Sequence, residues 1–340
     1  MLSLENITKS FGRIEVLRGL DLSVDRGEFI TLLGPSGCGK TTILRIIAGL
    51  ETADSGRVLM DGIDVNNLSP DKRGVNMVFQ NYALFPHMNV EQNVGYSLKL
   101  KKMAKPEIRQ AVKEALAMVQ LDGFEKRRPN ELSGGQKQRV AVARAIINKP
   151  KALLLDEPLG ALDLQLRRQL QGELKRIQKQ LGISFVYITH DQEEALAMSD
   201  RVAVMRNGVF EQTDSAVEVY KNPKTAFVAR FVGNANLISR DDKEFFAVRA
   251  ENIILTKPSV GGQAGGGESP SAGRPCLKAS VTEKSFSGGL LRVTAVIKSE
   301  GPSFGEEICS CVPGIDSPFE LGDDAEVSWL PTNAVTVRKE

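Results

Sequence analysis

Long hydrophobic runs are absent from this sequence of 340 residues, of which 41% are apolar. A helix that crosses a membrane needs about 20 consecutive apolar residues. The apolar runs found here, such as Phe29–Leu33 and 152–155, have the length of buried strands instead. The first residues also lack the basic start and apolar core of a secretory signal peptide. We therefore expect the chain to stay where it is made and to reach a membrane only through a partner.

The sequence has no large excess of positive or negative charge, and it has few cysteines. The 44 basic and 42 acidic side chains give a net charge of +2, which is not the strongly basic balance typical of nucleic-acid binding. The four cysteines, Cys38, Cys276, Cys309 and Cys311, are too few and too unevenly spread for a disulfide framework. One residue separates Cys309 from Cys311, which is shorter than the usual zinc-site spacing. We expect reduced thiols and no nucleic-acid partner.

Strand and helix signals alternate over the first 235 residues, as in an α/β protein with a parallel sheet. Short apolar runs at Phe29–Leu33, 151–155 and 183–189 predict buried strands. Leucines and an isoleucine at helical spacing predict an amphipathic helix over 164–181. Asp191 is a predicted helix cap, with Glu194 completing a capping box. The pair Asn207-Gly208 predicts a tight hairpin.

Two parts of the chain depart from this pattern. Residues 81–130 have helical patterning and predict a helical insert between two halves of the α/β domain, which spans 1–235. Short, valine-rich, alternating segments predict a small all-β barrel or sandwich over 236–340. Within it, the glycine- and serine-rich segment 258–275 is predicted to be a flexible loop.

A glycine-rich loop follows the first apolar run and satisfies the phosphate-loop pattern G-x-x-x-x-G-K-[ST]. Its glycines allow backbone N–H groups to surround phosphate oxygens, and the helix that follows adds partial positive charge. Lys40 is predicted to reach the β- and γ-phosphates of a nucleotide, and the Thr41 hydroxyl to bind Mg²⁺. The loop and the start of its helix comprise Gly34, Pro35, Ser36, Gly37, Cys38, Gly39, Lys40, Thr41 and Thr42.

Three further polar residues follow the other predicted strands. Asp156 ends one apolar run and is expected to hold Mg²⁺, while Glu157 is expected to accept a proton from an attacking water. His190 ends the next run, where it could touch the γ-phosphate and orient that water. Taken alone, an Asp-Glu pair after a strand also fits a solvated turn, and a strand-end histidine also fits a surface or capping residue.

The segment 132–139 contains Ser133, Gly134, Gly135 and Gln136 about two dozen residues before Asp156. It resembles the signature motif of the ATP-binding-cassette ATPases. Because the phosphate loop precedes it and the Asp-Glu pair follows it, the resemblance covers residues 1 to about 235. It implies an ATPase of the P-loop fold that uses ATP and Mg²⁺.

The resemblance assigns roles to four more residues. Phe11 matches the aromatic residue that stacks on adenine, with a core phenylalanine as the alternative. Gln80 matches the loop that senses the γ-phosphate and metal, which makes it a metal and catalytic residue. Asp163 matches the loop that crosses to a partner subunit. Thr42 matches the hydroxyl that contacts the α- and β-phosphates.

The chain has one phosphate loop and one signature segment. In the family, each ATP lies between the phosphate loop of one subunit and the signature of another. The resemblance therefore implies a homodimer with two sites, in which Ser133 and Gly135 act across the interface. It also implies two separate transmembrane permease subunits, an extracytoplasmic solute-binding protein as an indirect partner, and a peripheral position on the cytoplasmic face of the membrane.

Residues 231–236 and 248–253 resemble the start of the TOBE-like barrel appended to many importer ATPases, which favours import over export. Arg249-Ala250-Glu251 departs from the commoner Arg-Pro-Glu of that barrel, which leaves its role open between extending the dimer and regulation by a ligand. Segments around 163–169, 181–196 and 198–201 are most similar to spermidine/putrescine importer ATPases. Other segments also resemble ferric-iron and phosphonate importers.

The sequence disfavours two function classes other than transport. Cassette ATPases that act on DNA or ribosomes usually carry two cassettes, long coiled coils or basic arms, and the sequence shows none of these. A regulatory nucleotide switch without turnover is disfavoured by the presence of Glu157. The ATPase of an importer is therefore the prediction.

Overall fold

The structure is a computed structural model that describes residues 1–160, 162–258 and 274–339. It divides into two compact units, Met1–Ala216 and Val217–Glu340. The division falls before the expected boundary at residue 235, because helix α9 (Ala226–Phe231) packs its alanines against the C-terminal strands. Residues 259–273 of the predicted flexible loop lie outside the described residues.

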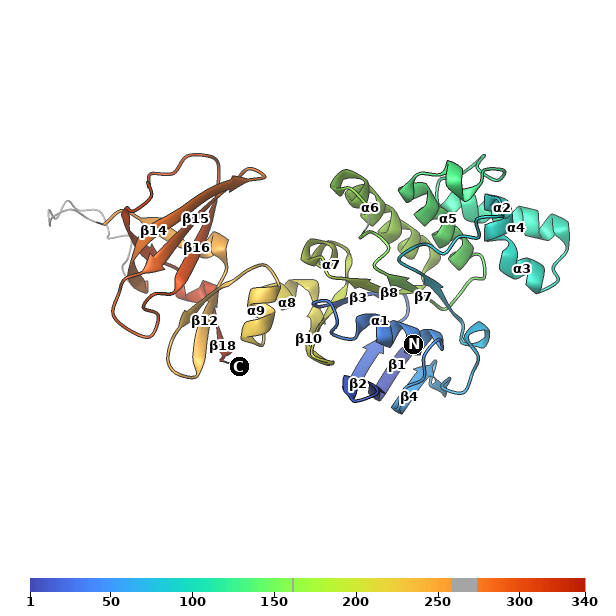
Figure 1. The fold of residues 1–340 in the computed structure, drawn as a ribbon, viewed down its shortest axis with the longest axis horizontal. Coiled ribbons are helices and arrows are strands. Elements are labelled where there is room, and N and C mark those ends of the chain that lie inside the picture. Colours follow the sequence, from blue (N-terminus) through green and yellow to red (C-terminus); the bar gives the residue numbers. More distant parts are fainter. Residues whose placement is uncertain (161, 259–273, 340) are drawn as a thin grey trace. The chain divides into compact units, whose positions relative to one another are not determined.

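A six-stranded sheet forms the centre of the first unit (Figure 1), in the order β10-β9-β3-β8-β7-β6. Strands β3, β9, β8, β7 and β6 run parallel, and β10 pairs antiparallel with β9 through the predicted Asn207-Gly208 hairpin. All parallel strands thus end at one edge. Their bounds are β3 Phe29–Leu33, β6 Val75–Val78, β7 Ala152–Asp156, β8 Ser184–Thr189, β9 Arg201–Arg206 and β10 Val209–Ser215.

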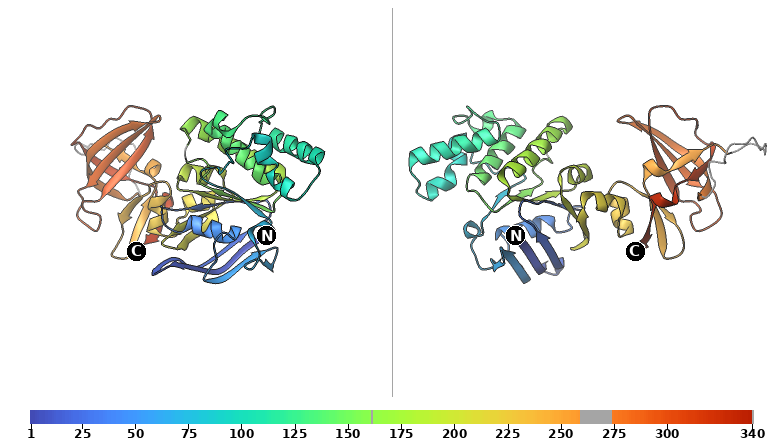
Figure 2. Two further views of the ribbon diagram at one scale, coloured as in Figure 1. Left: turned by 45° about the vertical axis from the view of Figure 1, so that its right-hand side comes forward. Right: turned by 180° about the vertical axis from the view of Figure 1, so that it is seen from behind.

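The two faces of this sheet bury separate cores, because successive side chains of a strand point to opposite faces. In β8, Phe185 and Tyr187 join one core and Val186 and Ile188 join the other. The first core holds α5 (Gly134–Ile146) and α6 (Leu164–Leu181), and α6 has the predicted bounds. The second core holds α1 (Lys40–Ala48). Figures 1 and 2 show these helices in separate layers on either side of the sheet.

A second, antiparallel sheet of four strands covers the α1 side, in the order β2-β1-β4-β5. Its strands are β1 Leu2–Phe11, β2 Ile14–Val24, β4 Ser55–Met60 and β5 Ile63–Asp64. The segment between β6 and β7 is helical, with α2 Val90–Val94, α3 Tyr96–Leu100 and α4 Lys105–Met118 before α5. Helix α7 spans Gln192–Met198. Within the described ranges, no helix combines the length and apolarity needed to span a bilayer.

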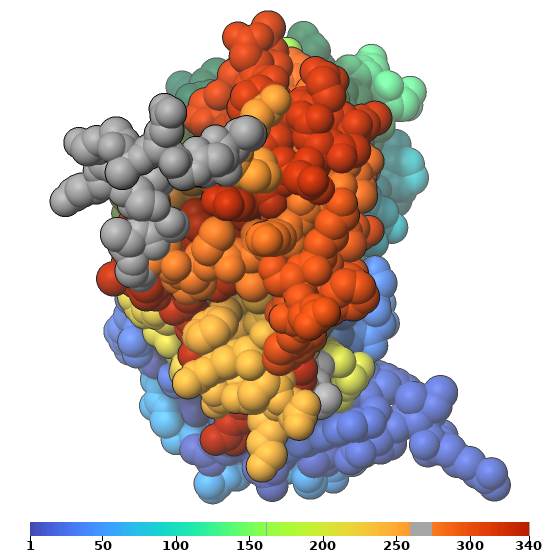
Figure 3. Space-filling view, turned by 90° about the vertical axis from the view of Figure 1, so that its left-hand side faces the viewer, coloured from blue at the N-terminus to red at the C-terminus, as the bar shows by residue number. Residues whose placement is uncertain are grey.

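The second unit begins one residue inside α8 (Ala216–Lys221) and continues with α9. The rest of it consists mainly of strands, as the sequence predicts. One sheet has the order β11-β12-β18 and the other β13-β17-β14-β15-β16. Both contribute to one core that includes Trp329. Figure 3 shows this unit in yellow to red. The bounds are β11 Asn236–Ser239, β12 Glu244–Val248, β13 Ile254–Thr256, β14 Cys276–Ser287, β15 Leu290–Ile297, β16 Glu307–Pro313, β17 Asp324–Ser328 and β18 Ala334–Arg338.

Arg249 joins the helices of the second unit to its strands. The side chain is buried, with 7% of its surface exposed. Its Nε donates to the carbonyl oxygen of Tyr220 at 3.1 Å, and its Nη1 donates to the carbonyl oxygens of Ala229, at 2.9 Å, and Val232. These three carbonyls lie at or beyond the ends of α8 and α9, where helices leave acceptors unsatisfied. The Arg-Ala-Glu segment, whose role the sequence left open, therefore fixes the helices to the strands.

We expect Arg249→Met to destabilise the second unit by about 3 kcal/mol, because several buried carbonyls lose a charged donor. Trp329 is the single tryptophan of the chain and lies in the core of this unit, so its fluorescence during urea unfolding reports this unit selectively. Arg240→Met removes an exposed arginine that pairs with Glu244 and should change the midpoint little. Equal midpoints for the two variants would contradict the role given to Arg249.

Candidate functional site

The carboxyl edge of the parallel strands brings together residues that are far apart in the sequence. The phosphate loop follows β3, Gln80 follows β6, Asp156 ends β7, and His190 follows β8. Strands β3, β8, β7 and β6 are consecutive neighbours in the sheet. Ligand sites in open α/β sheets lie outside this edge. The prediction that His190 and Asp156 follow neighbouring strands is confirmed.

The phosphate loop holds its shape through glycine and lysine. Gly39 has φ 107° and precedes α1, a backbone conformation that residues with a Cβ rarely adopt. A Cβ on Gly34 would stand 2.3 Å from the carbonyl oxygen of Met205. Lys40, with 5% of its surface exposed, donates from Nζ to the carbonyl oxygens of Gly34 at 2.7 Å and Pro35 at 2.9 Å. The ammonium is thus fixed beneath the loop.

Cys38 is the one loop side chain besides Lys40 that is buried. Its Sγ lies 3.8 Å from the Lys40 Nζ, and burial raises the pKa of the thiol above its ordinary value. Pro35, Ser36 and Gly37 are exposed. The loop therefore has an exposed outer turn, and the lysine ammonium is bound to two of its carbonyl oxygens.

Thr41 and Asp156, both predicted metal ligands, are in contact. The Thr41 hydroxyl donates to Asp156 Oδ1 at 3.1 Å. Burial raises the pKa of the Asp156 carboxyl, and the charge of Glu157 adds to that effect, while the hydrogen bond from Thr41 opposes it. A hydroxyl and a carboxylate oxygen are ligands that Mg²⁺ prefers. A bound divalent cation would offset the cost of burying this carboxylate.

Glu157 and His190 form the second contact of the site. His190 Nδ1 lies 3.2 Å from Glu157 Oε2. The Glu157 backbone is left-handed, with φ 43°, and its N–H donates to the carbonyl oxygen of Ile188 at 3.2 Å. A glutamate in this region of backbone space is strained, and such strain gathers at functional sites. The turn places a carboxylate beside an exposed imidazole.

The remaining residues that the family resemblance singled out lie on nearby segments of the first unit. Phe11 ends β1 with 48% of its surface exposed, so its ring is not part of the core, and the Lys9 ammonium lies 5.1 Å from the ring centre. Gln80 is exposed two residues after β6. Thr42 is half-buried in the first turn of α1.

Ser133 caps α5. Its Oγ accepts from the N–H of Gln136 at 3.3 Å, and Gln136 Oε1 accepts from the N–H of Ser133 at 3.0 Å. A Cβ on Gly134 would approach Leu162 to 3.1 Å, and one on Gly135 would approach Leu166 to 3.2 Å. The start of α5 therefore packs closely against the start of α6.

Asp163 is the residue before α6 and caps it, accepting from the N–H of Leu166 at 2.9 Å. Because α5 and α6 begin beside each other, the exposed residues Ser133 and Asp163 belong to one surface region, whereas Gly135 is buried. That region belongs to different elements from the phosphate loop. The structure thus places the predicted residues in two groups. We call the phosphate loop with Gln80, Asp156, Glu157 and His190 the nucleotide edge. We call the segment Ser133–Gln136 with Asp163 the signature surface.

One local prediction is wrong in part. Asp191 caps α7 as expected, because its Oδ1 accepts from the N–H groups of Glu193 and Glu194. The Glu194 carboxylate does not complete a capping box, however. It bonds instead to the hydroxyls of Tyr187 and Thr189 at 2.7 and 2.8 Å, because burial demands strong donors for a carboxylate.

Sequence reasoning missed Arg167, which contacts Asp191 and Leu162. It lies among exposed polar residues of α6, and no motif distinguishes it from the next residue, Arg168. Nothing in the sequence indicated this contact, because the burial of Glu194, which calls for a cation near it, is seen only in the structure.

Comparisons with known proteins agree with this geometry. A family model described as ABC transporter matches residues 17–160. The spermidine/putrescine import ATP-binding protein PotA of Hahella chejuensis is 58% identical over 241 residues, covering 71% of this chain and 66% of that protein. The protein of the same name from Acetivibrio thermocellus is 58% identical over 238 residues, covering 70% of this chain and 68% of that protein. The match to the Hahella protein thus spans slightly less than two thirds of its length.

Solved structures give the same fold. The dimeric ATP-binding cassette MJ0796, in a post-hydrolysis state bound to ADP and Pi, has a TM-score of 0.57 and 35% identity. It covers 64% of this chain, and the match covers 99% of that one. The cbiO1 protein from Clostridium perfringens, part of the ABC transporter complex cbiONQ, has a TM-score of 0.61 and 31% identity. It covers 64% of this chain, and the match covers 89% of that one.

Proposed function

The chain belongs to the ABC transporter family, and from that premise we propose that it is the ATP-hydrolysing subunit of an importer for spermidine and putrescine. One observation above all supports the proposal that the chain hydrolyses ATP. The paired contacts Thr41–Asp156 and His190–Glu157 lie at one sheet edge with the phosphate loop. That arrangement provides a metal-binding pair and a proton acceptor beside a phosphate cradle.

In the proposed reaction, the loop N–H groups and Lys40 bind the β- and γ-phosphates of ATP, and Phe11 stacks on the adenine. Thr41, Asp156 and Gln80 would hold Mg²⁺, which neutralises charge on the phosphates when bound. Glu157 accepts the proton of the attacking water, and the His190 imidazole orients that carboxylate and contacts the γ-phosphate. Thr42 contacts the α- and β-phosphates.

We place the second half of each site on a partner copy. Ser133 begins a helix of 13 residues, and the N-terminus of a helix attracts phosphate. Ser133, Gly134, Gly135 and Gln136 would therefore close over the γ-phosphate bound to the partner, and Asp163 would touch the partner's phosphate loop. ATP then holds two copies together, and hydrolysis releases them.

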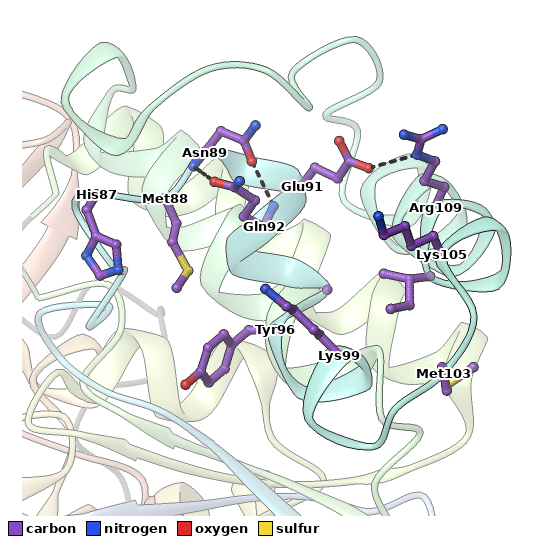
Figure 4. Close-up of a pocket in the computed structure, with 12 residues that line it drawn as sticks. His87, Met88, Asn89, Glu91, Gln92, Tyr96, Lys99, Met103, Lys105 and Arg109 are labelled. Carbon is purple, nitrogen blue, oxygen red and sulfur yellow. Dashed lines mark hydrogen bonds and ion pairs between the residues drawn. The ribbon is translucent and has the colours of Figure 1, made fainter.

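Membrane permease subunits would dock on the helical segment that follows Gln80. A hollow of about 640 Å³ lies there, between the residues after Gln80, α2 and the start of α4. Figure 4 shows His87, Met88 and Tyr96 on one side of it and Lys105 and Arg109 on the other. Glu91 Oε1 lies 3.7 Å from Arg109 Nε at its rim. Mixed apolar and charged walls suit a short amphipathic helix of a permease.

The proposed solute is a polyamine, because both relatives that are 58% identical are named as spermidine/putrescine import proteins. The chain would then lie on the cytoplasmic face of the membrane, with an extracytoplasmic solute-binding protein as an indirect partner. The transported solute would not enter this subunit. Its assignment as a polyamine therefore rests on the relatives and not on the geometry of the site.

Uptake of labelled spermidine tests the proposal in source cells that lack this gene. We expect uptake to fall strongly and to be restored by the wild-type chain but not by Glu157→Gln. Glu193→Gln, an exposed glutamate of α7, is the matched control and should restore uptake. Undiminished spermidine uptake together with lost uptake of ferric iron or phosphonate would reassign the solute.

A further inference from the structure

Arg167 connects the start of α6 with the start of α7 through one guanidinium group. Its Nη2 donates to the carbonyl oxygen of Leu162 at 3.1 Å, and its Nη1 donates to Asp191 Oδ2 at 3.0 Å. Its Nε lies 3.6 Å from Glu194 Oε1. Arginine suits this position because its planar, rigid fork of donors can serve several acceptors in fixed directions.

The two carboxylates beside Arg167, Asp191 as a hydrogen-bond acceptor and Glu194 as an ion-pair partner, fix the backbone on both sides of His190. Glu194 has 3% of its surface exposed, and its Oε2 accepts from the hydroxyls of Tyr187 and Thr189. Thr189 Oγ1 in turn accepts from the N–H of Asp191 at 2.9 Å. Burial of Tyr187 holds the pKa of its phenol well above the ordinary value, so this group remains a donor. His190 therefore stands between two residues that the network holds.

Burying these charged groups costs more free energy than a purely structural role of the network would justify. Two carboxylates, one of them buried, need a nearby cation, and a buried ion pair by itself adds little stability over packed apolar side chains. Helix α7 is already capped by Asp191. What the ion pairs add is a fixed geometry between the start of α6 and the strand end that carries His190.

The two ends of this network have different positions in the proposed dimer. Leu162 precedes Asp163, which faces the partner subunit in that proposal. His190 lies 3.2 Å from Glu157, the proposed proton acceptor. A continuous series of contacts thus runs from the partner-facing residue to the water-activating pair, through Arg167.

We propose that Arg167 is a positioning residue that makes the placement of His190 and Glu157 depend on the partner subunit. Contact of the partner with Asp163 fixes the start of α6, and Arg167 transmits that position to Asp191 and Glu194. Each site then hydrolyses ATP only when the partner is seated. This inference rests on the proposed dimeric ATPase.

The test compares Arg167→Lys, Arg167→Gln and the matched control Arg168→Gln in the purified full-length chain; Arg168 is the exposed neighbour in α6. We expect both Arg167 variants to lower kcat by roughly tenfold to a hundredfold, as displacement of catalytic groups by about 1 Å does. The KM for ATP should change little, and the Hill coefficient for ATP should fall toward one. The Arg168 variant should match wild type.

Thermal melting separates positioning from folding. Arg167→Lys keeps the cation beside Glu194, so it should melt near wild type and still lose cooperativity, and it carries the test if Arg167→Gln does not fold. One outcome would overturn this inference and leave the dimeric proposal intact. In it, the wild type is cooperative, and the Arg167 variants are folded and keep the wild-type kcat and Hill coefficient. A wild type that hydrolyses ATP without cooperativity, or not at all, would overturn the dimeric proposal and this inference with it.

Discussion

Glu157→Gln is expected to lower the kcat for ATP hydrolysis by about a thousandfold while leaving ATP binding intact. The amide keeps the size of the side chain and its reach to His190, which lies 3.2 Å from Glu157 Oε2. It cannot accept a proton from water, and a general base contributes about 10²–10⁴-fold. In the proposed function, phosphate is bound by the loop and Lys40, whose contacts with Gly34 and Pro35 the substitution does not touch. Steady-state hydrolysis and equilibrium binding of labelled ATP measure the two effects separately.

The control for that experiment is Glu193→Gln, which removes an equally charged but exposed glutamate three residues beyond His190. Its hydrolysis should equal that of wild type. A Glu157→Gln enzyme within about threefold of the wild-type kcat would exclude this carboxylate as the base. The regulatory-switch function would gain support only if the wild-type chain bound ATP without turnover.

Mixing two inactive variants should restore hydrolysis if each site is shared between two copies. Lys40→Met removes the ammonium that contacts Gly34 and Pro35, and Ser133→Arg blocks the N-terminus of α5 with a bulky side chain. In a mixed dimer, the intact phosphate loop of one copy faces the intact signature of the other. Random pairing gives about a quarter of the wild-type number of intact sites, since half of the dimers are mixed and each holds one such site.

The matched control mixes Lys40→Met with Glu157→Gln. Both defects lie on the nucleotide edge of the same chain, so no pairing produces an intact site, and hydrolysis should remain absent. Activity in this control would show that Glu157 acts on the partner's nucleotide. Failure of the Lys40–Ser133 mixture, with mixed dimers demonstrated by cross-linking, would contradict the shared site.

Much of the α/β unit could be predicted because its apolar strands are short and bounded by recognisable turns. The buried runs of β3, β7 and β8, the Asn207-Gly208 hairpin and the bounds of α6 all appear in the structure. Each depends on local pattern. The phosphate loop is equally local, because its backbone shape requires glycine at fixed positions.

What could not be predicted depends on contacts between distant residues. The four-stranded sheet of the first unit pairs β1 with β4, about fifty residues later, and no local periodicity encodes that pairing. The Arg167 network joins α6 to α7 across more than twenty residues. Glu194 was assigned to a capping box because spacing alone does not reveal that strand β8 presents two hydroxyls to it.

The most direct test of the central claim is accumulation of labelled spermidine by vesicles that contain this chain together with the membrane subunits that copurify with it. ATP is supplied on the side that carries this chain. The account predicts accumulation that requires hydrolysable ATP and disappears with Glu157→Gln. Active ATP hydrolysis by the same complex, with no spermidine or putrescine accumulating under any nucleotide condition, would contradict it.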